Sequence, residues 1–289
     1  MDKVRLGIVG VGVMGNGHAR QMPKIKEVEF TAVADIDPDA ADLAAEEYSV
    51  RAFQSSTDLI ESGLCDAVLV ATPHYDHPTI AIEAMRAGLH VYVEKPMSVR
   101  LSSADEMIKV ARETGQLLQV GFNSRATPVA QVARRIIEEG RLGEIYRTEL
   151  IDCSFRSQAY YDSATWRATW KGEGGGVLMN QSPHGLDRFV MLAGLPSRVN
   201  GRVMTRRHRI EVEDEASAIL EYPNGATGYV HCSVNEAPGG SRLEIMGEKG
   251  KLVLASRSLR LWEIPAGVQA FSDTTDVKYQ GPEVNEVEV

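Results

Sequence analysis

The sequence lacks features that several classes of protein require. Only three cysteines occur, Cys65, Cys153 and Cys232, and their spacing fits neither a Cys-X-X-Cys zinc motif nor a disulfide framework. No apolar run approaches membrane-spanning length, and no signal peptide precedes the first strand-like segment. These absences predict a cytoplasmic protein with buried thiols and no membrane partner.

Basic residues are also scarce relative to acidic ones. The 31 Lys and Arg against 40 Asp and Glu leave a net charge of -9, which repels nucleic acid and anionic lipid. We therefore expect no nucleic-acid partner. The 289 residues are enough for about two domains with separate cores. We expect the division at Gly121, with one domain over residues 1–121 and a second over residues 122–289.

A glycine-rich turn follows the first strand-like segment. Residues 10–15 read Gly-Val-Gly-Val-Met-Gly and match Gly-X-Gly-X-X-Gly. In this motif Gly10 forms a tight turn, Gly12 lets the backbone approach a pyrophosphate, and Gly15 lets the next helix pack closely. The helix N-terminus supplies an anion site beside Val13 and Met14. The alternative is a glycine turn without a ligand.

An acidic residue in the expected place supports nucleotide binding. Val28–Ala34 resembles a second strand, and Asp35 lies 20 residues after Gly15, where a carboxylate binds the ribose hydroxyls of adenosine. Asp35 could instead cap the following helix, although Asp37 is better placed for that role. The order of strand, turn, helix, strand and acid therefore predicts a dinucleotide site.

Asp35 also favours NAD over NADP. The 2′-phosphate of NADP would bring negative charge beside this carboxylate, and two unit charges about 4 Å apart repel by about 4 kcal/mol at an effective dielectric of about 20. The next residue, Ile36, is apolar, and no Lys or Arg precedes Arg51. The expected cofactor is therefore NAD.

Strand and helix patterns continue to alternate up to Gly121. The expected strands are Ala67–Ala71, His90–Glu94 and Leu117–Val120, and the expected helices are Pro78–Ala87 and Ser103–Thr114. This alternation is typical of an α/β fold with a doubly wound parallel sheet, the Rossmann arrangement.

The second half of the chain has a different pattern. A helix is expected at Pro128–Glu139 and another at Val177–Leu192. Turn signals separate several strands and suggest hairpins. The expected strands are Glu144–Phe155, Arg198–Arg206, Ala216–Tyr222, Gly228–Ser233, Leu243–Met246 and Lys251–Leu254. The second domain is therefore expected to be α+β, built on a mostly antiparallel open sheet.

The segment Val93-Glu94-Lys95-Pro96, joined with the glycine motif, resembles the glucose-fructose oxidoreductase, inositol dehydrogenase and rhizopine-catabolism (Gfo/Idh/MocA) family. The resemblance covers most of residues 4–190. Further matches are Thr72-Pro73 with His77, Gly121-Phe122-Asn123, Trp166-Arg167, and Gly174-Gly175-Gly176 followed by His184 and Asp187. It implies a nicotinamide-dependent oxidoreductase acting on a sugar, polyol or inositol-like alcohol. It also implies a homo-oligomer, a dimer or tetramer formed through the open face of the second sheet.

The resemblance assigns roles to particular positions. Lys95, His184 and Asn180 are expected in the active site. The residues expected at the cofactor, beyond the glycine turn and Asp35-Ile36, are Thr72, Pro73, His77, Glu94, Lys95, Asn123, Trp166 and Arg167. Trp166 and Arg167 could instead be ordinary core and surface residues.

The chemistry of Lys95 agrees with the implied role. It ends a parallel strand, at the edge where open α/β sheets bind ligands. Pro96 biases Lys95 towards extended geometry. An ammonium there can bond the substrate oxygen and stabilise the charge that develops on it as hydride leaves the carbon. A solvated lysine at a strand end is the alternative.

His184 is the family's proton-transfer residue by resemblance, and the ordinary pKa of histidine suits that task. A packed helix histidine is the alternative. Family members commonly carry Asp four residues before this histidine, whereas this chain has Asn180. An amide can orient the ring but cannot stabilise an imidazolium as a carboxylate does. We therefore hypothesise that His184 is a weakened base and that Lys95 shares the acid–base work.

Other patterns in the sequence are weaker evidence for a functional site. His74, Asp76 and His77 could suggest a metal cluster, but such a loop more often makes capping or solvent contacts, and no metal site is expected. A basic run is most simply a solvated strand edge, with an anionic substrate or a neighbouring subunit as alternatives. The run comprises Arg202, Arg206, Arg207, His208 and Arg209.

The resemblance also implies further helices beyond Val289. A truncated chain and a naturally short chain are therefore both open.

Three functions remain open from the sequence. An NAD-dependent dehydrogenase acting on CH–OH groups is favoured by Lys95 and His184. A glycosidase-like lyase using NAD transiently is the second, although its relatives often alter the Glu-Lys-Pro segment. A non-enzymatic NAD or sugar sensor is the third, suggested by Asn180 and by the end of the chain at Val289.

Overall fold

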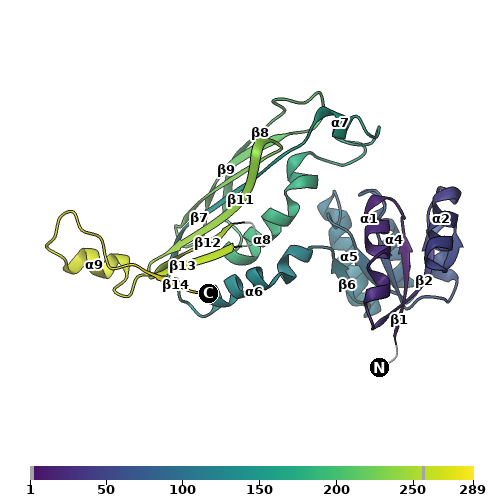
Figure 1. The fold of residues 1–289 in the computed structure, drawn as a ribbon, viewed down its shortest axis with the longest axis horizontal. Coiled ribbons are helices and arrows are strands. Elements are labelled where there is room, and N and C mark those ends of the chain that lie inside the picture. Colours follow the sequence, from purple (N-terminus) through teal and green to yellow (C-terminus); the bar gives the residue numbers. More distant parts are fainter. Residues whose placement is uncertain (1–2, 256–257) are drawn as a thin grey trace. The chain divides into compact units, whose positions relative to one another are not determined.

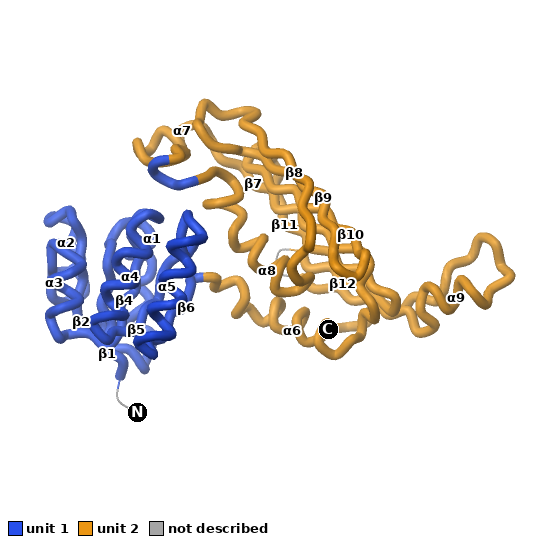
Figure 2. The backbone as a smooth tube through the Cα atoms, turned by 180° about the vertical axis from the view of Figure 1, so that it is seen from behind, with its two compact units in different colours: residues 1–121, 171–174 blue, residues 122–170, 175–289 orange. Residues whose placement is uncertain are grey.

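The computed structural model describes residues 3–255 and 258–289, which form two compact units (Figures 1 and 2). Unit 1 comprises the chain up to Gly121 together with Lys171–Gly174, and unit 2 comprises Phe122–Trp170 and Gly175–Val289. The sequence places Lys171–Gly174 in the second domain, so this assignment needs correction. These residues pack with unit 1 because the Glu173 carbonyl oxygen lies 3.0 Å from His74 Nδ1.

Unit 1 contains a six-stranded sheet whose strands are all parallel. Their order is β3-β2-β1-β4-β5-β6, so the chain winds outward in both directions from β1. The strands are β1 (Val4–Val9), β2 (Val28–Ala34), β3 (Arg51–Phe53), β4 (Ala67–Val70), β5 (His90–Val93) and β6 (Leu118–Val120). This confirms the doubly wound Rossmann sheet.

Helices cover both faces of this sheet, which is why its central strands are apolar on both sides. Ile8 and Leu69 pack with α1 and α2 on one face, whereas Val68 and Val70 pack with α3, α4 and α5 on the other. The helices are α1 (Val13–Ala19), α2 (Pro38–Tyr48), α3 (Ser56–Glu61), α4 (His77–Arg86) and α5 (Leu101–Thr114). With both faces covered, the carboxyl ends of the strands are the edge available to a ligand.

Unit 2 contains an eight-stranded sheet in the order β14-β13-β12-β11-β7-β10-β9-β8. Among the described strands of this sheet, only β7 and β10 pair in parallel, so the expected mostly antiparallel sheet is confirmed. The strands are β7 (Ile145–Phe155), β8 (Arg198–Met204), β9 (Glu215–Glu221), β10 (Thr227–Ser233), β11 (Asn235–Gly247), β12 (Gly250–Ala255), β13 (Ser258–Glu263) and β14 (Asn285–Val287).

Helices α6 (Pro128–Glu138) and α8 (Pro183–Ala193) pack along one face of the unit 2 sheet (Figure 1). Two shorter helices, α7 (Gln158–Tyr161) and α9 (Val268–Thr274), complete the unit. The covered face holds the core, where Leu150 and Leu243 of neighbouring strands meet Phe189 of α8. The opposite face of the sheet carries a charged network around Glu244.

Strand β11 extends much further than its expected core at Leu243–Met246. It begins at Asn235, and its pairing with β7 shifts register between Asn235 and Gly240. Pro238 and the glycines that follow weaken the strand pattern, which hides this half of β11 from sequence reasoning.

The single helix expected over Val177–Leu192 is wrong. The chain instead forms a wide π-type turn at Val177–Gln181, and α8 begins afresh with Pro183 at its first position. Proline has no N–H to continue an earlier helix, but it fits a first helical position well. Asn180 and His184 therefore lie on separate elements.

In the parts of the chain that the structure describes, no helix has the length and apolar character needed to cross a bilayer.

Candidate cofactor and active site

The glycine turn has the geometry that its motif predicts. Gly10 adopts a φ of 88°, and a Cβ on Gly15 would lie 1.8 Å from the Gly10 carbonyl oxygen, so both positions require glycine. Nothing described in the structure lies within 4 Å of a Cβ built on Gly12, which leaves space beside the backbone. Val13 and Met14 are exposed next to it. This turn fits a pyrophosphate at the start of α1.

Asp35 is fixed directly beside this turn. Its Oδ2 accepts a 2.8 Å hydrogen bond from Val11 N, and its Oδ1 accepts one of 3.0 Å from Asp37 N. Asp37 is the residue that caps α2, so the capping alternative for Asp35 is wrong. Each carboxylate oxygen can accept a second bond, which suits a pair of ribose hydroxyls. Ile36 is exposed next to it.

His77 ties together two loops at the carboxyl edge of the sheet. It is buried at the start of α4, with Nδ1 2.9 Å from Pro96 O and Nε2 2.9 Å from Thr72 O. Burial lowers the pKa of His77 more than these two contacts raise it. Both ring nitrogens face carbonyl oxygens, so His77 holds the loops after β4 and β5, including the Thr72-Pro73 turn, in place.

Glu94 is anchored by the first helix. Its Oε1 lies 2.6 Å from His18 Nε2, and its Oε2 accepts a 3.1 Å hydrogen bond from Lys95 N. Burial raises the pKa of Glu94, but the contacts with His18 and Lys95 outweigh burial and leave this pKa below its usual value. Sequence reasoning missed His18, because no motif marks it.

Lys95 follows β5 and is largely buried among acidic groups. Burial lowers the pKa of its ammonium, while the carboxylates of Glu94 and Glu173 act in the opposite direction. Glu173 is itself only 1% exposed and reaches this site from the Lys171–Gly174 segment. A lysine whose pKa is lowered gives up its proton more readily than an ordinary lysine does, which suits proton exchange with a substrate. Sequence reasoning missed Glu173, although it directly precedes the Gly174-Gly175-Gly176 motif.

His184 occupies the first turn of α8 in unit 2. Its ring meets the edge of the Phe122 ring at 6.0 Å between centroids and an interplanar angle of 88°. The turn that contains Asn123 packs against this helix, since Ser124 Oγ donates to the His184 carbonyl oxygen at 3.3 Å. The same turn is tied to α8 by an ion pair between Arg125 and Asp187. Phe122 and Asn123 are thereby held beside the histidine.

Asn180 lies in the π-type turn that precedes α8. A buried carboxylate, Glu213, shapes this region by accepting hydrogen bonds from Gly176 N at 2.9 Å and Leu178 N at 3.0 Å. A Cβ on Gly176 would lie 1.8 Å from the Glu213 carbonyl oxygen, which explains the glycine. Glu213 was not expected from the sequence, because it lies 37 residues from Gly176.

Trp166 and Arg167 form a small aromatic and cationic cluster. The Arg167 guanidinium lies 4.5 Å from the Trp166 ring centroid and 4.7 Å from that of Tyr160, and it donates to Tyr160 Oη at 3.1 Å. Such stacking holds a guanidinium in a fixed direction. The cluster therefore presents one guanidinium in a fixed direction beside two aromatic rings.

The basic run has two separate explanations. Arg202 lies on the edge strand β8, as the strand-edge interpretation predicts. Strand β8 ends at Met204, however, and the residues after Thr205 form a loop around buried Asp214, which accepts bonds from the backbone N–H groups of Arg206 and Arg207. Burial raises the pKa of Asp214, but these and further bonds outweigh it and bring the value to about 2.

Two family models match the chain over most of its length. The oxidoreductase family with an NAD-binding Rossmann fold matches residues 4–122, and the Gfo/Idh/MocA C-terminal domain matches residues 130–253. The rhizopine catabolism protein MocA of Rhizobium meliloti is 30% identical over 83% of this chain and 74% of its own length. The myo-inositol 2-dehydrogenase of Thermotoga maritima is 26% identical over 86% and 74%.

Solved structures agree with this assignment. The WlbA dehydrogenase from Bordetella pertussis, in complex with NADH and UDP-GlcNAcA, has a TM-score of 0.83 and 34% identity over 88% of this chain and 80% of its own. Levoglucosan dehydrogenase in complex with NADH has a TM-score of 0.84 and 25% identity over 100% and 80%. With the glycine turn and Asp35 arranged as described, the chain belongs to the Gfo/Idh/MocA family and is an NAD-dependent oxidoreductase.

Proposed function

We propose that the protein transfers hydride between NAD and a carbon that bears a secondary alcohol or ketone in a sugar, polyol or inositol-like substrate. The observation that carries this proposal is the environment of Lys95, a buried lysine of lowered pKa at the carboxyl edge of a doubly wound sheet. The names of the similar proteins support the substrate class, since they include dehydrogenases of inositol and levoglucosan.

The chain's own residues account for the proton in this reaction. NAD, when bound, accepts the hydride from the substrate carbon as the alcohol becomes a ketone. Lys95 is proposed to contact the substrate oxygen and to stabilise the negative charge that develops there. The hydroxyl proton passes either to the neutral amine of Lys95, which becomes the ammonium facing the oxygen, or to His184, and it is then returned to solvent. In the reducing direction the same groups donate the proton to the new alkoxide.

The cofactor contacts are proposed from the same positions. Gly10, Gly12 and Gly15, with Val13 and Met14, would bind the pyrophosphate, while Asp35 and Ile36 would face the adenosine. The remaining proposed contacts are Thr72, Pro73, His77, Glu94, Lys95, Asn123, Trp166 and Arg167. His77 would act indirectly, because its ring holds the loops that carry Thr72 and Pro96.

A substrate panel tests the proposal. Purified protein shown to bind NAD would be incubated with inositols, anhydrosugars, free sugars and a UDP-linked sugar acid, and NADH formation followed by absorbance. We expect turnover with at least one class. Sugar release without net NADH would instead indicate the lyase reaction, and NAD binding without turnover of any compound would support the sensor.

We further propose a homo-oligomer that forms through the face of the unit 2 sheet not covered by α6 and α8. Ile219 and Tyr229 pair across β9 and β10 and expose 59% and 40% of their surface. Exposed apolar side chains on a sheet face are typical of protein interfaces. Sedimentation equilibrium of the wild type and of Tyr229→Glu tests this. A wild-type monomer would contradict the proposal.

A further inference from the structure

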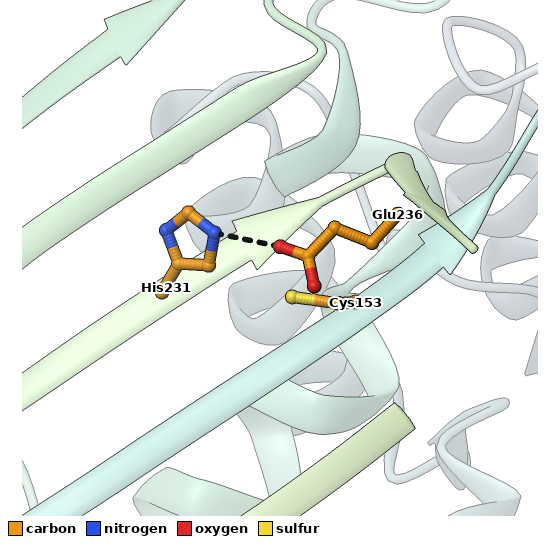
Figure 3. A group of neighbouring side chains, drawn as sticks. All are labelled: Cys153, His231 and Glu236. Carbon is orange, nitrogen blue, oxygen red and sulfur yellow. Dashed lines mark hydrogen bonds and ion pairs between the residues drawn. The ribbon is translucent and has the colours of Figure 1, made fainter. Parts of the chain in front are cut away.

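Three metal-ligating side chains meet at one end of the unit 2 sheet. Cys153 belongs to β7, His231 to β10, and Glu236 to the irregular start of β11. Between Asn235 and Gly240 the pairing of β11 with β7 is interrupted, so residues 236–239 bulge over the sheet. The bulge places the Glu236 carboxylate between the imidazole and the thiol (Figure 3).

The cluster lies on the face of the sheet away from α8. Side chains alternate along a strand, and Leu150 of β7 packs in the core with Phe189 of α8, so Cys153 points to the opposite face. The bulge packs tightly on β7 there, since a Cβ on Gly239 would lie 2.6 Å from the Cys153 carbonyl oxygen. Cys153 is buried beneath it, while the Glu236 side chain is 46% exposed.

The spacing of the donor atoms is close to that of a tetrahedral metal site. The ligand atoms of all three residues lie within 4.8 Å of one another, and His231 Nε2 is 3.2 Å from Glu236 Oε1. Tetrahedral zinc with bonds of about 2.0–2.3 Å separates its ligand atoms by about 3.3–3.6 Å. The imidazole and carboxylate are thus already close to the required separation, and the thiol sulfur lies within 4.8 Å of both.

We propose that Cys153, His231 and Glu236 bind one zinc ion, with water as the fourth ligand. One thiolate, one imidazole and one carboxylate form a ligand set that zinc accepts, whereas calcium and magnesium prefer oxygen alone. The ion would fasten the 236–239 bulge to β7 and β10. This site is independent of the proposed dehydrogenase reaction.

The surroundings of His231 fit a metal ligand. Its Nδ1 lies 2.8 Å from Ser217 Oγ on the neighbouring strand β9. When Nδ1–H donates to this hydroxyl, the lone pair of Nε2 points towards Glu236 and Cys153. Zinc-bound histidines commonly make such an outer contact, which fixes both the tautomer and the direction of the ring.

Zinc binding must displace a proton from Cys153. Zinc binds the thiolate, whereas an ordinary cysteine thiol is mostly protonated at neutral pH. The Zn–S bond forms as the S–H bond breaks, and the proton passes to solvent. Zinc affinity is therefore expected to rise with pH.

The test is a ZnCl2 titration of the full chain after chelator treatment, using a competing zinc indicator. We expect one zinc per chain and an increase in Tm. The Co²⁺-loaded protein should show a thiolate charge-transfer band. Cys153→Ser and Glu236→Gln should each weaken zinc binding by more than about 30-fold, since losing a direct ligand costs at least as much as losing an outer contact.

Cys65→Ser is the matched control, because Cys65 is a buried thiol in unit 1 and should leave zinc binding unchanged. Glu236→Gln keeps the shape of a half-exposed side chain, so its effect is not one of misfolding; circular dichroism checks this. The proposal is overturned if the wild type binds no zinc, or if both variants bind it as tightly as the wild type.

Discussion

The two sheets of this protein present their polar groups in different places. The parallel sheet of unit 1 has helices on both faces, and its buried charged residues, Glu94 and Glu173, gather at the carboxyl ends of its strands. The sheet of unit 2 is covered by helices on one face, and a charged network spreads across the other. A sheet covered on both faces leaves one edge for chemistry, whereas an open face offers a broad surface for partners.

The largest expected effect is on turnover, from a substitution at the carboxyl edge of the unit 1 sheet that leaves the unit 2 sheet intact. Lys95→Ala should lower kcat by about 10²–10⁴-fold, because it removes a proton-transfer group, and should leave the stability of unit 2 unchanged. Steady-state kinetics with NAD, together with a urea melt, measure both. Lys109→Ala on α5 is the matched control, since that side chain is exposed. A kcat within a few-fold of the wild type would rule out the assigned role.

The reverse pattern is expected on the open face. Glu244 is buried beside Arg147, Arg242 and Lys251, and Glu244→Gln should destabilise unit 2 by about 1–3 kcal/mol, because charge-assisted hydrogen bonds are lost. Urea unfolding measures this. Glu286→Gln, an exposed partner of Arg260, should cost much less. Equal effects of the two substitutions would contradict the expectation.

The same carboxylate makes stability depend on pH. Burial raises the pKa of Glu244, but Lys251, Arg147 and Arg242 outweigh burial and lower this pKa below its ordinary 4.5. The stabilisation is thus fully present above pH 4.5 and is lost as pH falls through the lowered value. Wild type and Glu244→Gln should therefore converge in stability on acidification.

A smaller effect, on cofactor preference, is expected at Asp35, the proposed contact of the adenosine ribose. Asp35→Asn should reduce the preference for NAD over NADP by about tenfold, because a third of the roughly 4 kcal/mol repulsion corresponds to that factor. The measurement is the ratio of kcat/KM for the two cofactors. Asp37→Asn is the control, since Asn also caps helices well. An unchanged ratio in Asp35→Asn would show that this carboxylate does not select the cofactor.

The smallest expected effect concerns the turn before α8. Asn180→Asp should move the acidic limb of the turnover profile to higher pH, because a nearby carboxylate raises the pKa of an imidazolium at His184. The pH dependence of kcat measures this. Gln181→Glu adds the same charge one residue later and controls for a general electrostatic effect. An acidic limb that does not move would count against the hypothesis that Asn180 weakens His184 as a base.

Sequence reasoning predicted unit 1 better than unit 2, for a physical reason. The strands and helices of unit 1 alternate along the sequence. Each glycine of the motif also predicts a specific backbone geometry, as at Gly15, where a Cβ would lie 1.8 Å from the Gly10 carbonyl oxygen. In unit 2 the pairing partners are distant, and Pro238 with its glycines conceals half of β11. Strand β14 was missed because it is a three-residue edge strand, and β13 was missed although Leu259 and Leu261 alternate with polar residues as a strand pattern does.

The candidate site follows the same rule. Lys95 and Asp35 were identifiable because each sits at a fixed place in a local motif. Glu173, which affects the pKa of Lys95, and His18, which contacts the neighbouring Glu94, come from remote segments. Their contacts depend on the tertiary structure, which no local sequence pattern predicts. The sequence pattern allowed Pro183 within the first turn of one long helix, whereas in the structure a turn ends before Pro183 and α8 begins there.

The Lys171–Gly174 segment has a consequence for how the protein can be divided. A fragment ending at Gly121 would hold every described strand of the unit 1 sheet, yet it would lack the carbonyl that meets His74 and one of the two carboxylates near Lys95. Such a fragment would keep the glycine turn, but Lys95 would lose the negative charge of Glu173, which raises its pKa. Recombination between relatives at the apparent domain boundary would therefore exchange a part of the surroundings of Lys95 together with the second half of the chain.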